Sequence, residues 1–110
     1  MDLLNKKCVP CEGGAKPMTK EESQKYLAGV LGWEMSDDGK KIIHTFENSD
    51  FAAALSFVNA VGKIAEEEGH HPDIHLVSYK KVIIEFSTHA IGGLSENDFI
   101  MAAKINAMRG

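Results

Sequence analysis

The sequence lacks a hydrophobic run that could cross a membrane, because its apolar stretches are far shorter than the ~18 residues that a spanning helix needs. Residues 1–7 contain no hydrophobic segment of the kind found in a secretory signal. Basic residues are also few: 12 Lys and Arg stand against 16 Asp and Glu, and the formal net charge is −4. Without a positive excess to neutralise phosphates, direct nucleic-acid binding is not expected. These absences favour a cytoplasmic protein with neither a membrane nor a direct nucleic-acid partner.

Cysteine is scarce, since only Cys8 and Cys11 occur, and two closely spaced thiols cannot form a disulfide framework. Their spacing suits half of a zinc site or a redox dithiol. A redox pair normally opens a helix, whereas Gly13-Gly14 and Pro17 follow this one. We therefore interpret the two cysteines as reduced thiols in an irregular segment.

The length of 110 residues allows one domain. Residues 1–18 carry no periodic apolar pattern and predict an irregular, peripheral N-terminal arm, which leaves residues 19–110 as the folded domain. Hydrophobic residues make up 44% of the chain, enough for a packed core. A domain of this size buries only about 60–70% of its unfolded surface, so self-association is expected.

Three segments combine a capping residue with apolar residues at three- or four-residue spacing, which predicts helices. The first begins at Thr19, where Thr19 and Glu22 form a capping-box pattern, and continues to about Leu31. The second covers about residues 50–69, and the third follows Ser95. The core-facing residues expected in the second helix are Phe51, Ala54, Leu55, Val58, Val61, Ile64 and Ala65.

Two hairpins alternate with these helices. Residues 33–35 and 41–46 are separated by a turn-forming segment, and residues 74–79 and 81–88 form a second β-rich pair. The resulting order α-β-β-α-β-β-α predicts an α+β fold with a four-stranded antiparallel sheet and three helices on one face. The other face of the sheet is expected to meet a second subunit.

Histidines gather around the second predicted hairpin. His70 and His71 precede its first strand, and His89 follows its second. Because the start and the end of an antiparallel hairpin lie side by side, the three imidazoles should meet at one edge of the sheet. Pro72 restricts His71 to extended backbone. Converging imidazoles point to proton transfer near neutral pH.

Two other interpretations of the histidines remain open. His70, His71 and His75, together with Asp73 or His89, could bind zinc. Adjacent side chains in extended backbone diverge, however, so a His-His pair rarely reaches one ion. The histidines could also be ordinary surface residues.

One spaced pattern extends across the second half of the chain: Glu66-x-x-x-His70-His71-Pro72, then Tyr79, His89 and Asp98. With this pattern, and with Gly32-Trp33 and Thr88-His89, the chain resembles the pterin-4a-carbinolamine dehydratase family over about residues 19–107. The resemblance excludes the N-terminal arm.

The resemblance implies an enzyme that dehydrates 4a-hydroxytetrahydropterin, the product left by an aromatic amino acid hydroxylase, to quinonoid dihydropterin. This reaction recycles tetrahydrobiopterin-type cofactors and uses neither a metal nor an organic cofactor. The family's three active-site histidines correspond to His70, His71 and His89, and its acidic residue corresponds to Glu66. The family also implies a homodimer or homotetramer.

We assign acid–base chemistry at the carbinol carbon to His70 and His89, and binding of the pterin to His71. Glu66 is expected to accept a proton from an imidazole. The further substrate-binding candidates are Pro72, Trp33 and Thr88.

The remaining polar and aromatic residues of interest have structural interpretations. Tyr79 is expected to pack in the hairpin, Asp98 to support the cap of the last helix, His75 to be exposed on a strand and His44 to be structural. The alternative to an enzyme is a non-catalytic module of the same fold that binds pterins or acts as a dimerisation and transcription cofactor, a role that family members have in animals.

Overall fold

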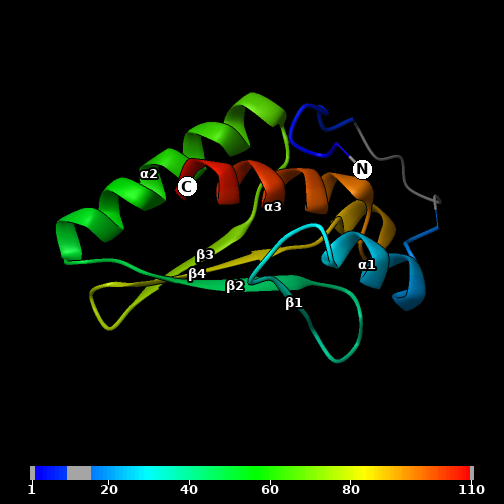
Figure 1. Ribbon diagram of the computed structural model, residues 1–110, viewed down its shortest axis with the longest axis horizontal. Helices are drawn as coiled ribbons and strands as arrows, with labels where there is room; N and C mark the ends of the chain where they lie inside the picture. Colours follow the sequence, from blue (N-terminus) through cyan, green and yellow to red (C-terminus); the bar gives the residue numbers. More distant parts are fainter. Residues whose placement is uncertain (1, 10–15, 110) are drawn as a thin grey trace.

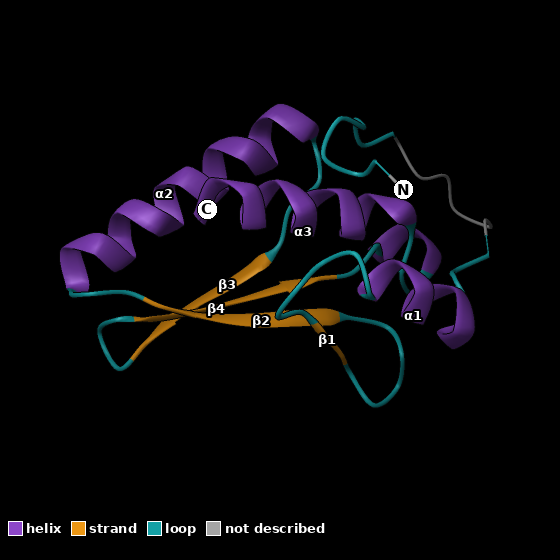
Figure 2. Ribbon diagram, viewed as in Figure 1, coloured by secondary structure: helices purple, strands orange, loops and turns teal. Residues whose placement is uncertain are grey.

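Three helices cover one face of a four-stranded antiparallel sheet in the computed structural model, which describes residues 2–9 and 16–109 (Figures 1 and 2). The predicted order and fold class are confirmed. No helix in the described part of the chain is long and apolar enough to cross a membrane. The elements are α1 (Lys20–Leu27), β1 (Glu34–Met35), β2 (Ile42–Glu47), α2 (Phe51–Glu68), β3 (Asp73–Val77), β4 (Lys81–Phe86), the short 3-10 helix η1 (His89–Ile91) and α3 (Glu96–Arg109).

The sheet has the strand order β1-β2-β4-β3, and every neighbouring pair is antiparallel. In the β3–β4 hairpin, Asp73 pairs with Glu85, so the start of β3 lies beside the end of β4. The segments that precede β3 and follow β4 therefore leave the sheet at the same edge. This register positions the functional site.

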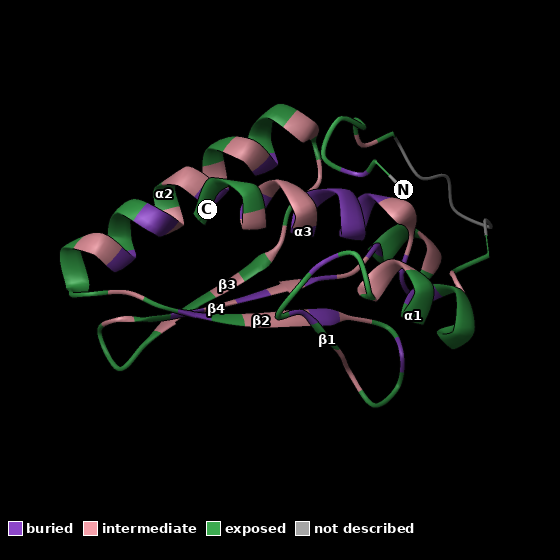
Figure 3. Cartoon of the chain, in the orientation of Figure 1, coloured by how far each residue is buried: buried purple, intermediate pink, exposed green. Residues whose placement is uncertain are grey.

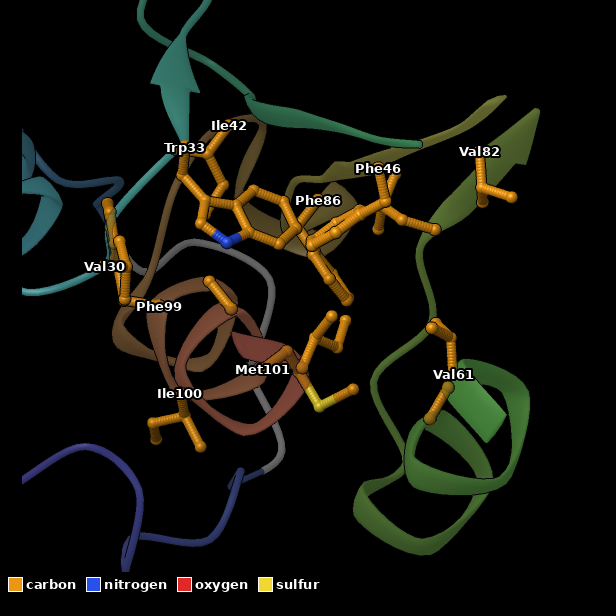
Figure 4. Packing of buried hydrophobic residues seen from close by; sticks show 14 of the residues in the cluster. Val30, Trp33, Ile42, Phe46, Val61, Val82, Phe86, Phe99, Ile100 and Met101 are labelled. Atoms are coloured by element: carbon orange, nitrogen blue, oxygen red, sulfur yellow. The ribbon is translucent and has the colours of Figure 1, made fainter. Parts of the chain in front are cut away.

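The core lies between the sheet and the helices. Val82, Ile84 and Phe86 alternate along β4 and are fully buried on the face that the helices cover. Phe99 and Met101 of α3 belong to the same buried cluster, and the buried residues of the helices concentrate on their inner faces (Figures 3 and 4). The period-two alternation of a strand that faces water on one side thus determines which residues of β4 form the core.

The buried face of α2 agrees with the prediction only in part, since Ala54, Val61 and Ala65 are buried as expected. Phe51 and Leu55 are exposed, whereas Phe57 is buried together with Val61. Apolar residues occur around most of the circumference of α2, so their spacing fits more than one face. The contacts with β4 and α3, which the sequence does not show, select the face that contains Phe57.

Two further packing predictions are wrong. The first helix ends at Leu27, so Leu31 lies beyond it and is exposed. Tyr79 is also exposed, because it lies in the three-residue turn between the paired residues Val77 and Lys81, where Ser78 and Tyr79 have positive φ of 48° and 52°.

The sequence predicted a peripheral arm, but the described N-terminal residues, 2–9, pack on the domain. Leu3 is buried in the core, and the backbone oxygen of Leu4 accepts a hydrogen bond from Lys104 Nζ at 2.9 Å. Lys6 forms an ion pair with Glu96 at 2.9 Å. This segment lies beside α3, one end of which it covers (Figure 1).

His44 is held by aromatic contacts, in agreement with its structural interpretation. Its ring stacks on Phe46 with centroids 3.8 Å apart and meets the edge of Trp33 at 5.4 Å. Burial lowers the pKa of His44 below its ordinary value of 6.5. The folded chain therefore resists binding a proton that the unfolded chain accepts.

We expect His44 to make stability depend on pH. As the pH falls below about 6.5, the unfolded chain gains a proton on His44 that the folded chain does not, so the free energy of unfolding decreases until the lower folded pKa is reached. Urea unfolding between pH 7.5 and 5 should show a steeper loss for the wild type than for His44→Gln. Equal slopes for the two proteins would contradict this prediction.

Candidate active site

A cleft of about 260 Å³ opens at the edge of the sheet where β3 begins and β4 ends. Its volume suits a small ligand. His70, His71 and His89 all line it, so the convergence predicted from the hairpin is observed. Among the described residues, those that line the cleft are Val9, Gly69, His70, His71, Ser87, Thr88, His89, Ala90 and Asn97.

Gly69 makes the turn that places His70 and His71 at the cleft. It ends α2 in the left-handed conformation, with φ of 65°, and its N–H donates to Ala65 O. Glycine adopts this conformation without a steric penalty. The chain therefore turns sharply at the end of α2, and His70 and His71 follow immediately at the edge of the sheet.

His70 is held firmly by a buried carboxylate. Its Nε2 lies 2.6 Å from Asp98 Oδ1, and the side chains of His70 and Asp98 are 12% and 0% exposed. The imidazole also stacks on Phe86, with centroids 5.9 Å apart and planes 10° from parallel. An ionised carboxylate can only accept, so Nε2–H donates to Asp98 and the lone pair of a neutral ring resides on Nδ1.

Asp98 serves the site and helix α3 at once. Its Oδ2 accepts hydrogen bonds from the backbone N–H of Ser95 and the hydroxyl of Thr88, both at 2.9 Å. Because the Thr88 hydroxyl donates to Asp98, it accepts from the Ser95 hydroxyl at 2.7 Å. The predicted capping role of Asp98 is confirmed, but its bond to His70 was missed. The presence of Asp98 beside the histidines in the family pattern was the one available signal.

His71 is more exposed to solvent than His70. Its Nε2 lies 2.5 Å from Glu66 Oε2, the contact expected for Glu66, and the side chains of His71 and Glu66 are 60% and 77% exposed. The adjacent histidines therefore bind two different carboxylates while lining the same cleft. Within residues 2–9 and 16–109, no group of three or more His, Cys, Asp or Glu side chains is placed to hold a metal ion.

His89 is shared by two clefts. It is the first residue of η1 and is exposed. Together with Ser87 it also lines a second cleft of about 260 Å³. The loop is fixed by the bridge between Thr88 and Gly93, in which Thr88 N–H donates to Gly93 O at 2.8 Å. The other residues of the second cleft are Asp38, Lys40, Lys41, Gly92 and Gly93.

Thr88 is buried and lines the cleft, whereas the three other substrate-binding candidates, Glu66, Pro72 and Trp33, are not among its described lining residues. Trp33 is buried in the core, and its Nε1–H donates to Asn106 Oδ1 at 3.0 Å (Figure 4). Pro72 follows His71 but is outside the set of described lining residues. The structure therefore places Trp33 as a core residue. His75, as predicted, is exposed on β3.

The cysteine pair is only partly described. Cys8 N–H donates to Glu68 Oε1 at 2.9 Å, and Cys8 Sγ lies 3.7 Å from the backbone oxygen of Asn97. Cys11 lies outside the described residues. The interpretation of the pair as reduced thiols therefore stays a prediction.

The fold and the cleft together define a small α+β protein in which three histidines line one cleft. A family model described as "Pterin 4 alpha carbinolamine dehydratase" matches residues 16–108. The chain therefore belongs to the pterin-4-alpha-carbinolamine dehydratase family, which consists of carbon–oxygen lyases, and the resemblance seen in the sequence is confirmed.

Individual relatives agree with this assignment. The chain is 48% identical to "Pterin-4-alpha-carbinolamine dehydratase 2, mitochondrial" of Arabidopsis thaliana, over 98% of this chain and 59% of that protein. It is 47% identical to a "Putative pterin-4-alpha-carbinolamine dehydratase" of Methylococcus capsulatus, over 96% and 92%. The "transcriptional coactivator/pterin dehydratase" crystal structure from Brucella melitensis superposes with a TM-score of 0.80 at 32% identity, covering 86% of this chain and 100% of that one.

Proposed function

We propose that the chain dehydrates 4a-hydroxytetrahydropterin to quinonoid dihydropterin in the cleft lined by His70, His71 and His89, as a step in recycling a tetrahydrobiopterin-type cofactor. The observation that carries the proposal is the His70–Asp98 pair, a partly buried imidazole oriented by a fully buried carboxylate at the cleft where His89 also lies. Family membership supplies the substrate class.

The reaction requires two proton movements. The C4a–O bond breaks and the hydroxyl leaves as water, so it must gain a proton. N5 loses its proton, and the electron pair of the N5–H bond forms the N5=C4a double bond. Positioned imidazoles perform such transfers with rate gains of about 10²- to 10⁴-fold each. The net reaction releases one water and needs no redox partner.

The environments of the histidines suggest their roles. His70, whose Nε2–H donates to Asp98, offers Nδ1 as the base for the N5 proton, and the carboxylate stabilises the imidazolium that forms. His89, exposed in the lining of the same cleft, is the remaining imidazole to protonate the leaving hydroxyl. His71, hydrogen-bonded to Glu66, binds the pterin at the solvent-exposed rim.

The test is to generate the 4a-carbinolamine in situ and to follow its ultraviolet absorbance as it decays. Because this dehydration also proceeds without an enzyme, the rate must rise in proportion to the amount of added protein. The acceleration should survive exhaustive treatment with EDTA. A rate equal to that without protein would contradict the proposed function, and activity lost to EDTA and restored by Zn²⁺ would favour the zinc alternative.

A non-catalytic cofactor role is the second candidate, because the Brucella melitensis protein of similar structure is also named a transcriptional coactivator. The same assay separates the two functions. The homodimer or homotetramer implied by the family stays a prediction, which sedimentation equilibrium of the full chain can check. The cytoplasmic location also stays a prediction, and the named Arabidopsis relative is mitochondrial.

A further inference from the structure

The backbone of Val9 is fixed at the cleft by the side chain of Asn97. Asn97 Oδ1 accepts a hydrogen bond from Val9 N–H at 3.0 Å, and Asn97 Nδ2 donates to Val9 O at 2.6 Å. This pair of bonds satisfies both backbone polar groups of one residue, as a neighbouring strand would. Asn97 is itself buried and directly precedes Asp98 in α3, so Val9 is tied to the helix that also orients His70.

The rest of the described arm holds this arrangement in place. The next residue back, Cys8, donates its N–H to Glu68 at the end of α2. Leu3 is buried in the core, and Leu4 is bound by Lys104. Contacts with both α2 and α3 therefore position Val9 where the chain reaches the cleft.

The Val9 side chain is apolar and yet 65% exposed, and it is one of the residues that line the cleft. Much of the remaining lining is polar: the three histidines, Ser87, Thr88 and Asn97. Small-molecule sites commonly combine a few polar groups that orient the ligand with an apolar surface that contacts its flat faces. Val9 is an exposed apolar side chain held rigidly at the place where such a surface is needed.

We infer that Val9 packs against the heterocyclic ring of the substrate, so that the N-terminal arm forms a wall of the site and helps to determine which ligands bind. This inference rests on the proposed function, since it takes the ligand to be a pterin. Val9 is a specificity-determining residue and takes no part in proton transfer. It should therefore affect binding much more than the chemical step.

Kinetics of Val9→Ala provide the first test. Removal of two methyl groups from the contact should raise KM about 3- to 10-fold, with kcat within twofold of the wild type. The matched control is Leu4→Ala, which shortens an apolar side chain of the same arm, 46% exposed, that lies outside the described cleft lining. Equal KM values for the wild type, Val9→Ala and Leu4→Ala in an active enzyme would overturn the inference and leave the proposed function intact.

Methyl NMR provides a test that needs no turnover. With 7,8-dihydrobiopterin as the probe, the ring current of the pterin should shift the Val9 methyl signals, which are identified by their loss in Val9→Ala. The methyl signals of Val77, on β3, should not move. If the wild type lacks dehydratase activity but the Val9 signals shift, the proposed function fails and the inferred wall stands. Val9 signals that stay unchanged at saturating probe would overturn the inference whatever the activity.

Discussion

His70→Ala is expected to lower kcat by about 10²- to 10⁴-fold, because it removes the imidazole to which we assign the N5 proton. His70 combines low exposure with a buried ionic partner, Asp98, at 2.6 Å. A positioned base with this environment contributes mainly to the chemical step. The measurement is the initial rate of carbinolamine decay at saturating substrate, after subtraction of the uncatalysed rate.

His75→Ala is the matched control for this experiment. His75 is also paired with a carboxylate, Glu85, at 2.7 Å, but it is on β3 and outside the described cleft lining. Its removal should leave kcat close to that of the wild type. His70→Asn, which retains a donor, tests whether loss of folding explains the effect. If His71→Ala lost far more turnover than His70→Ala, the division of roles between the two residues would be wrong.

Asp98→Asn is expected to lower kcat by about 10²-fold or more with little change in KM. An amide nitrogen that faces Nε2 donates, so the imidazole must present a lone pair there and carry its proton on Nδ1. The base would then be in the wrong tautomer, a known consequence of this substitution in enzymes with an Asp-oriented histidine. Asp98 therefore acts as a positioning residue, and the difference between kcat and KM is the measurement that reports it.

Two comparisons distinguish the expected loss of kcat in Asp98→Asn from a loss of folding stability. The amide oxygen of Asp98→Asn can still accept from Ser95 and Thr88, whereas Asp98→Ala leaves both donors buried and should cost on the order of 2–4 kcal/mol in unfolding free energy. Glu96→Gln changes another carboxylate in the first turn of α3, one that pairs with Lys6 away from the cleft, and should keep its kcat. An Asp98→Asn enzyme with wild-type kcat would show that the carboxylate does not orient the base.

The sequence predicted the part of the site that depends on strand pairing. The antiparallel register alone brings His70, His71 and His89 to one edge, because their positions relative to the hairpin are local information. The partner of His70 could not be found in this way. Asp98 is separated from it by 28 residues, and only the packing of α3 over the sheet brings the two together.

The other missed features have similar causes. The buried face of α2 depends on which neighbours it meets, because apolar residues surround much of the helix. Val9 belongs to a segment without periodicity, and side chain-to-backbone bonds from Asn97 place it. Trp33 adjoins the first strand in sequence, but the short β1 turns its indole into the core. Sequence patterns predict elements and their pairing, and they leave open the contacts between elements.

The pairing of His70 and His71 with two different carboxylates has a consequence for repeated turnover. If one imidazole takes a proton from N5 and another gives a proton to the departing hydroxyl, each cycle leaves the first charged and the second depleted. The enzyme is ready again only after a proton has travelled between them. His71 lines the same cleft and is paired with the water-exposed Glu66, so in the proposed mechanism we expect this pair to exchange protons with the bulk solvent between turnovers.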